Sequence, residues 1–380
     1  MFNRMFLLGI VVLFFSVTTP LASAQTVVGW GWNYHGQINV PTTGIYTAIA
    51  VGWRHSLALK TDGTIVGWGN NDFGQINVPT IGTFKAIAAG DFYSLALKAD
   101  GTIVGWGYNE YGQTNVPTTG TYTAIAAGLN RSLALKTDGT IVGWGYNDSI
   151  QINVPTTGTY GAISAGYFHS LALKTDGTIV GWGYNDWGQI NVPTTGTYTA
   201  IAAGGGHSLA LKTDGTIVGW GWNPNGQINV PTTGTYTAIA AGVTHSLALK
   251  TDGTIVGWGN NDLGQINIPA TGTYTAIAAG PYHSLAMKTG VPTPQGQTAA
   301  IIAKVQALVA AGTLTSDQGL IDKLNQIVAK LNGGQTGPAC SQLSAFINQV
   351  SGFVNSGALT PAQGQALTSA ASAVRTQIGC

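Results

Sequence analysis

The sequence has 380 residues, of which only 8% are charged, and it contains 55 glycines and a formal net charge of +1 at pH 7. Few charges together with many glycines and aromatics exclude a disordered acidic or basic chain and favour β structure interrupted by turns. Nucleic acids and anionic membranes attract basic surfaces, which a nearly neutral chain does not offer, so we expect neither as a partner.

Residues 1–24 are typical of a secretory signal peptide. Arg4 supplies the positive charge, an apolar stretch follows at 5–17, and Ala-Ser-Ala at 22–24 is a small-residue cleavage pattern. The apolar stretch is shorter than the roughly 20 residues that span a bilayer. We therefore expect an exported protein without membrane insertion once the leader is removed, with an uncleaved anchor as the alternative. The sequence does not distinguish the periplasm, the cell surface and the extracellular space.

Residues 25–291 are built from a repeat. The tripeptide Val-Gly-Trp recurs with a constant step of 38 residues in seven copies, whose tryptophans are Trp30, Trp68, Trp106, Trp144, Trp182, Trp220 and Trp258. A copy contains four short segments typical of β-strands, AIAAG, HSLALK, TIVGWG and QINV, each bounded by Gly, Pro or Asn. Four short strands in each of seven copies predict an all-β, seven-bladed propeller.

The residue types suit this architecture. The small side chains of AIAAG fit the crowded axis, and we expect Leu57, Leu59 and the seven repeat tryptophans to fill the space between stacked blades rather than to contact a ligand. Asp-Gly between the second and third segments, as at Asp62-Gly63, predicts a hairpin with a two-residue type I′ turn.

The last copy, HSLAMKTGVP at 283–292, lacks this Asp-Gly. The chain begins with only the third and fourth segments of a blade (27–40) and ends the array with only the first and second (276–288). We therefore expect the N-terminal strands to close the last blade, which leaves no exposed sheet edge.

The copies differ mainly in two loops that the antiparallel order places on one face. Aromatic residues are frequent there, and Tyr, Trp and Arg provide much contact area at low entropic cost. We predict a partner-binding face; unconstrained drift of loop tips is the alternative. The residues predicted to form the partner-binding face are Trp32, Tyr34, Trp53, Arg54, Phe73, Phe92, Tyr93, Tyr108, Tyr111, Tyr167, Phe168, Trp187, Trp222 and Tyr282.

The segment HSLALKTDGTIVGWGYN at 169–185, followed by Gly-Gln, resembles the repeat of the regulator of chromosome condensation family. The added GQINVP and AIAAG make the copies more similar to a secreted bacterial branch that includes the propeller-type β-lactamase inhibitor protein. The resemblance implies a seven-bladed propeller that binds proteins. It does not indicate which protein is bound. Nucleotide exchange on a small GTPase and chromatin binding, known in eukaryotic members, do not suit an exported neutral protein. Ile150 replaces the Gly of Gly-Gln, and we expect the loop at 148–150 to be reshaped.

Catalytic and metal chemistry find little support in the sequence. A histidine precedes SLALK in five copies (His55, His169, His207, His245 and His283), while Tyr93 and Arg131 take its place in the other two. A ring spread over the blades is too wide for one tetrahedral metal, so we expect structural hydrogen bonds instead. The loop carboxylates, one to a blade, do not form the close pair that glycosidases need. We expect no catalytic activity, no metal and no cofactor.

After a linker at 292–297, residues 298–380 change in composition to Ala, Leu, Gln and Ile. Two related units, VAAGTLTSDQG and VNSGALTPAQG, each end one helix with Gly and open another with Thr and a Gln three residues later. These pairs, Thr315/Gln318 and Thr360/Gln363, are capping boxes, and Pro361 fits the first helical position. We predict four helices in two antiparallel hairpins.

The only cysteines, Cys340 and Cys380, flank the second of these hairpins. Export permits a disulfide there, which in the chain-entropy model would stabilise this small module by roughly 4 kcal/mol. The module resembles a FIMAH-type helical domain of secreted bacterial proteins, and the sequence does not indicate its role.

Together these features predict an exported, non-catalytic binding protein whose aromatic face docks a folded protein, with inhibition of an enzyme as one form of that function. A carbohydrate-binding propeller at the cell surface is the alternative, because Trp and Tyr beside Asn and Asp also suit sugar rings. The sequence indicates neither the partner's identity nor the oligomeric state.

Overall fold

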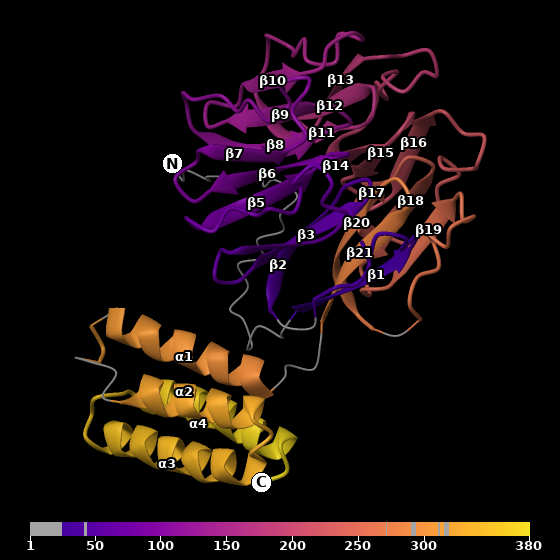
Figure 1. The fold of residues 1–380 in the computed structure, drawn as a ribbon. Helices are drawn as coiled ribbons and strands as arrows, with labels where there is room; N and C mark the ends of the chain where they lie inside the picture. Colours follow the sequence, from indigo (N-terminus) through magenta and orange to yellow (C-terminus); the bar gives the residue numbers. More distant parts are fainter. Residues whose placement is uncertain (1–24, 42–43, 271, 290–293, 311, 315–318) are drawn as a thin grey trace, which may run out of the picture. The chain divides into compact units, whose positions relative to one another are not determined.

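The computed structural model describes residues 25–41, 44–270, 272–289, 294–310, 312–314 and 319–380 (Figure 1). The predicted signal peptide lies outside the described residues. The described chain forms two compact units, a β unit that ends at Thr289 and a helical unit that ends at Cys380. No helix in the described ranges is long and apolar enough to cross a bilayer.

The β unit consists of seven antiparallel sheets of three strands each, which confirms the predicted seven-bladed propeller. Each sheet is one blade, and blades 1 to 7 follow the order of the chain. Their strands are β2 (Tyr46–Val51), β3 (His55–Lys60) and β4 (Ile65–Gly69); β5 (Phe84–Ala89), β6 (Tyr93–Lys98) and β7 (Ile103–Gly107); β8 (Tyr122–Ala127), β9 (Arg131–Lys136) and β10 (Ile141–Gly145); β11 (Tyr160–Ala165), β12 (His169–Lys174) and β13 (Ile179–Gly183); β14 (Tyr198–Ala203), β15 (His207–Lys212) and β16 (Ile217–Gly221); β17 (Tyr236–Ala241), β18 (His245–Lys250) and β19 (Ile255–Gly259); and β20 (Tyr274–Ala279), β21 (His283–Thr289) and β1 (Gln25–Gly31).

The fourth strand predicted for each blade is wrong, because the QINV segment forms a turn. In blade 1 the Ile76 N–H donates to Asn71 Oδ1 at 3.1 Å, and the Val78 N–H donates to the Ile76 carbonyl at 2.8 Å. Pro79 follows and has no N–H to offer a ladder. The segment instead presses Ile76 onto β4 at Gly67, where an added Cβ would lie 3.0 Å from the Ile76 Cβ.

Apolar side chains of adjacent blades form the core between them, as predicted. Leu57 and Leu59 of β3 are buried against Phe84 and Ala96 of the next blade. The Trp68 indole packs on the previous blade and donates from Nε1 to the Gln37 carbonyl at 2.9 Å. The same bond to the preceding blade recurs for the other six repeat tryptophans. Each tryptophan therefore packs against the preceding blade and, through its hydrogen bond, fixes the position of its own blade relative to that one.

Blade 7 is closed by the N-terminus, as predicted. The strand order is β1, β21, β20, so β21 pairs on one side with its sequence neighbour and on the other with the first strand of the chain (Figure 1). Trp30 of β1 donates from Nε1 to the Gln265 carbonyl at 2.9 Å, across 235 residues of sequence. The last copy lacks Asp-Gly because its next strand comes from the other end of the array.

The hairpins between the second and third strands are present, but their turn type differs from the prediction. The Gly63 N–H donates to the Lys60 carbonyl at 3.0 Å, and the Lys60 N–H donates to the Thr64 carbonyl at 2.8 Å. Among the described non-glycine residues only Ile150 has a positive φ, so Asp62 does not, whereas Gly63 has φ of 80°. This pattern fits a three-residue loop ending in a glycine bulge rather than a type I′ turn. Asp62 Oδ1 accepts from the Thr64 N–H and hydroxyl and favours this form.

The histidines that precede SLALK join the blades in a buried ring of hydrogen bonds. His55 Nε2 lies 2.9 Å from Ser94 Oγ of the next blade, and His283 Nε2 lies 2.9 Å from Ser56 Oγ across the closure. His169, His207 and His245 repeat this contact with Ser208, Ser246 and Ser284. The prediction of structural hydrogen bonds is confirmed for all five.

The direction of these bonds follows from the serine. Ser94 Oγ donates its proton to the Gln75 carbonyl at 2.9 Å and so accepts the proton of His55 Nε2. The His55 Nδ1 is then an unprotonated atom, and it is buried without a hydrogen-bond partner. Burial lowers the pKa of each ring histidine to about 3, so the ring is neutral at physiological pH.

The helical unit contains α1 (Pro294–Ala310), α2 (Leu320–Asn332), α3 (Thr336–Asn355) and α4 (Pro361–Gln377), which confirms the four predicted helices. The capping box of Thr360 and Gln363 is present with Pro361 in the first turn, while Thr315/Gln318 lies outside the described residues. The helices share an apolar core that includes Phe346. The predicted disulfide joins Cys340 to Cys380 with a Cα–Cα distance of 5.8 Å.

Candidate binding face

The loops after the first and third strands of each blade lie at the same end of the strands, because neighbouring strands are antiparallel. The loop after β4 shows how its shape is held. Gln75 Oε1 accepts from the Phe73 N–H at 2.9 Å, and Asn71 Nδ2 donates to Asn77 Oδ1 at 2.9 Å. The buried Gln and the paired Asn recur in the copies, so one rigid frame presents a different side chain at the Phe73 position of each blade.

Aromatic rings from four neighbouring blades, blades 7, 1, 2 and 3, form a continuous surface, here named the long arc. Trp53 and Phe92 have ring centroids 4.9 Å apart, and Phe92 and Phe73 are 5.1 Å apart, which are favourable separations for aromatic pairs. Further ring contacts extend this surface, so that the long arc comprises Tyr34, Trp32, Tyr282, Trp53, Phe92, Phe73, Tyr108, Tyr111 and Tyr146.

A second set of rings, the short arc, covers blades 4 and 5. It comprises Tyr167, Phe168, Tyr184, Trp187 and Trp222, with successive ring centroids between 5.1 and 6.0 Å apart. Tyr146 and Tyr184 extend the two arcs beyond the predicted residues. They occupy the same place in their repeats as the predicted Tyr108, and this equivalence would have identified them.

Arg54 is the cation of the face. Its guanidinium carbon lies 4.6 Å from the centre of the Trp53 ring, and it also lies within 6 Å of the Trp32 and Phe92 rings, at 5.8 and 5.9 Å. Such contacts stabilise a guanidinium over an aromatic face. The side chain thus lies within the long arc, close to three of its rings.

Exposure differs among the predicted residues. Tyr34, Phe73, Tyr111 and Trp187 are exposed, at 81%, 46%, 42% and 42%, and most of the others are half-buried beside them. Tyr93 corrects the prediction, because it is completely buried and cannot reach a partner. It occupies the histidine position of blade 2, where its hydroxyl donates to the Arg131 carbonyl and accepts from Ser132 Oγ.

The two arcs are separated on one side by small residues. Blade 5 carries Gly205 and Gly206 where other blades carry aromatics, and blade 6 carries Val243 and Thr244. A Cβ on Gly206 would lie 2.7 Å from Cε3 of Trp187, so the glycine leaves the room that the indole occupies. The face is therefore asymmetric, with aromatic and small-residue sectors.

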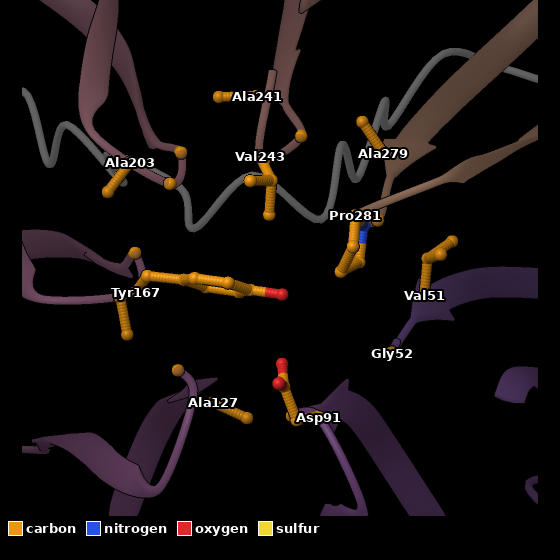
Figure 2. A pocket seen from close by; sticks show the side chains of 18 of the residues that line it. Val51, Gly52, Asp91, Ala127, Tyr167, Ala203, Ala241, Val243, Ala279 and Pro281 are labelled. Carbon is orange, nitrogen blue, oxygen red and sulfur yellow. The ribbon is translucent and has the colours of Figure 1, made fainter. Parts of the chain in front are cut away.

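A cavity of about 70 Å³ opens at the axis, between the ends of the first strands (Figure 2). Its wall is mostly Gly and Ala, together with Val51, Val243 and Pro281, and two polar side chains reach into it, Asp91 and Tyr167. Figure 2 shows the Tyr167 hydroxyl and the Asp91 carboxylate facing each other, and the two are hydrogen-bonded. Sequence reasoning did not single out Asp91, although six other copies carry no acid at this position.

Burial dominates the electrostatics of Asp91. The side chain is 4% exposed, and loss of hydration raises the pKa of its carboxyl to about 8, although the hydrogen bond from Tyr167 opposes the shift. The carboxyl is therefore mostly protonated at neutral pH. Tyr167 itself is half-buried, and its ring forms a wall of the cavity rather than a freely exposed anchor.

The loop at 148–150 keeps the shape of the other copies, so the predicted reshaping is wrong. Ile150 has φ of 60°, close to the 74° of the equivalent Gly188, and its N–H donates to the Asn147 carbonyl at 3.0 Å as in the repeat. A left-handed conformation is unfavourable for a β-branched residue. The hydrogen bonds of the loop therefore outweigh the backbone preference of Ile150.

Replacing Ile150 by Gly should raise the free energy of unfolding by about 1 kcal/mol, because it removes left-handed strain while costing some unfolded-state entropy. Urea denaturation of the two proteins measures the change. The matched control is Gly188→Ile, which should lower the stability of the neighbouring blade. Equal stability of Ile150→Gly and the parent would contradict the strained conformation.

The chain was compared with known families and structures. The family model of the regulator of chromosome condensation (RCC1) repeat matches residues 46–75, 84–113, 122–151, 162–189, 198–227 and 236–265. A comparison with curated proteins found no match to the sequence.

Solved structures share the propeller fold at low sequence identity. Prp20p of Saccharomyces cerevisiae is 19% identical, with a TM-score of 0.62 over 73% of this chain and 94% of that one. Human WBSCR16 is 18% identical, with a TM-score of 0.59 over 70% and 99%. The ectodomain of the Physcomitrella patens receptor kinase CR4 is 24% identical, with a TM-score of 0.55 over 62% and 68%. The propeller of this chain is thus built from repeats that match the regulator of chromosome condensation (RCC1) repeat.

Proposed function

We propose that the protein is a non-catalytic binding protein whose two aromatic arcs dock a folded protein partner. The observation that carries this proposal is the concentration of diverging aromatic side chains on one face of a scaffold that is otherwise nearly identical in every copy. Large, rigid aromatics supply contact area at low entropic cost and are frequent among the residues that dominate binding energy.

Structures with the same fold offer a precedent for protein partners. The Prp20p structure was described with its binding to Gsp1p and histones, and yeast RCC1 (Prp20) was solved bound to Kap60. These partners belong to those proteins; for this chain we infer only the class of partner. The predicted leader supports a role outside the cytoplasm, and the resemblance to the secreted bacterial branch makes inhibition of an enzyme one form of this function.

A carbohydrate ligand is the second candidate, and the ring pair of Tyr34 and Trp32 favours it. The two rings lie nearly parallel, with an interplanar angle of 10°, and Tyr34 is 81% exposed. Flat exposed rings of this kind can stack on sugar rings. Pull-down with the leader-free protein and a glycan array separate the two candidates: a strong glycan signal without any protein partner would reverse their order.

Two tryptophans of blade 4 test the binding face directly. Trp187 is 42% exposed in the short arc, whereas Trp182 is 8% exposed in the core and donates to the Gln151 carbonyl. Trp187→Ala should leave the melting temperature nearly unchanged and weaken partner binding by roughly 1 to 4 kcal/mol. Trp182→Ala should instead cost roughly 3 to 5 kcal/mol of stability through loss of a core aromatic.

Calorimetric melting and titration with the captured partner measure the two effects. A loss of stability in Trp187→Ala as large as that in Trp182→Ala would show that the short arc is part of the core, and the proposed face would fail.

A further inference from the structure

Among the described residues, Asp91 is the only Asp, Glu, Lys, Arg or His that lines the axial cavity. It is 4% exposed, and its neighbours in the wall are Gly, Ala, Val and Pro, apart from Tyr167. At the equivalent position other copies carry residues without charge, including Leu129, Gly205 and Val243. The fold therefore accepts an uncharged residue here, and a buried carboxylate is not needed for packing.

Within the described chain Asp91 has no cationic partner. The arginines of the two adjacent blades are committed elsewhere: the Arg131 guanidinium donates to the Tyr167 and His169 carbonyls at 2.7 and 2.5 Å, and the Arg54 guanidinium lies on the Trp53 ring. An ionised carboxylate buried without a counterion is expensive, which is why the group keeps its proton instead. A cation supplied from outside would remove this cost.

We propose that the axial cavity receives the alkylammonium end of a lysine side chain presented by the partner protein, with Asp91 as its counterion. This inference rests on the proposed function and adds the chemistry of the contact. The cavity opens on the face that carries both arcs, and its volume of about 70 Å³ is sufficient for the end of an unbranched side chain.

The geometry favours an ammonium over a guanidinium. Tyr167 already hydrogen-bonds the carboxyl group, which leaves Asp91 less able to form the paired contacts that a planar guanidinium makes with both oxygens. A compact ammonium needs only one free oxygen. The methylenes of lysine would lie against the Ala and Val side chains of the wall, where Figure 2 shows Ala203, Ala279 and Val243 around the axis.

Occupation by a cation requires Asp91 to lose its proton, so binding should depend on pH. The other titratable groups around it are Tyr167, Tyr93 and, next to Tyr167, Tyr282, with the Arg131 cation beside Tyr93; none of these groups is a histidine or a carboxylate. The pKa of the Asp91 carboxyl is about 8 in the free protein, so affinity for an ammonium should rise up to tenfold per pH unit from pH 6 and level off above pH 8.

The first experiment uses n-butylammonium chloride as a probe, with 1-butanol as its neutral counterpart, and follows binding to the full leader-free chain by NMR. At pH 8 the parent should bind the ammonium at least tenfold more tightly than the alcohol. Asp91→Asn should lose this preference and its pH dependence, and it should stay folded because a neutral amide of the same size replaces a mostly protonated carboxyl. Asp72→Asn, a loop carboxylate of the same face that already accepts from Asn70, should bind as the parent does.

Equal binding of ammonium and alcohol by the parent, or unchanged ammonium binding by Asp91→Asn, would overturn the site. The second experiment uses the partner captured by pull-down, for which Asp91→Asn should weaken binding at least tenfold and acetylation of the partner's lysines should do the same.

The two proposals fail separately. If Trp187→Ala disrupts the complex and Asp91→Asn does not, the lysine contact is wrong and the binding face stands. If no protein is captured while butylammonium binds at Asp91, the lysine source is wrong and the cavity is a site for a free amine.

Discussion

Lowering the pH from 7 should unfold the propeller in one steep transition between about pH 5.5 and 4. The five ring histidines are completely buried, their Nε2 protons are given to serines, and their Nδ1 atoms have no partner. Burial lowers the pKa of each from 6.5 to about 3. The unfolded chain therefore binds protons below pH 6.5 that the folded chain cannot accept, and folding loses stability as the pH falls through this range.

The size of the effect follows from linkage. Each histidine costs about 1.4 kcal/mol of stability per pH unit below 6.5. Asp91 acts in the opposite direction, because its raised pKa of about 8 makes the folded chain the better proton acceptor between pH 8 and 3.8. Unfolding therefore takes up about four protons, five on the histidines less one from the carboxyl, and the free energy of unfolding falls by about 5 kcal/mol per pH unit. A domain stability of roughly 5 to 15 kcal/mol would be exhausted within about one to three units.

Urea unfolding at several pH values measures this slope. His207→Tyr, which copies the residue found at this position in blade 2, should remove about one proton from the uptake. A stability that is constant between pH 6.5 and 4.5 would contradict the neutral buried ring.

Deletion of residues 25–41 should abolish the cooperative unfolding of the propeller or cause aggregation. The deletion removes β1, which pairs with β21 and closes blade 7, and it removes Trp30, whose indole binds the Gln265 carbonyl. It also removes Gln37, whose carbonyl accepts from Ser56 and Trp68 of blade 1. Both blades that meet at the closure are then damaged, and β21 exposes a row of unpaired backbone groups.

Deletion of residues 290–380 is the control, because the helical unit is compact on its own and contributes no strand to a blade. Calorimetry should show a cooperative propeller transition for this protein and none for the N-terminal deletion. A normal transition in the absence of residues 25–41 would show that the array closes without β1.

The repeat made much of the architecture readable from sequence. The constant 38-residue step, the two half-blades at the ends of the array and the Thr360/Gln363 box are local patterns that act through short-range geometry, and the blades, the closure and the helices agree with them. The aromatic loops were also visible, because nearly identical copies reveal the positions at which they differ.

Other features depended on contacts between blades that no local pattern contains. The QINV segment has strand-forming residues, yet in blade 1 it forms a turn. The Ile76 N–H of this turn donates to Asn71 Oδ1, and the Ile76 side chain packs on Gly67. Tyr93 is aromatic and adjacent to a variable loop, but its place in the ring buries it. Asp91 became a candidate site only because the closed array brings it to the axis opposite Tyr167, 76 residues away in the chain, where burial rather than sequence context sets its protonation.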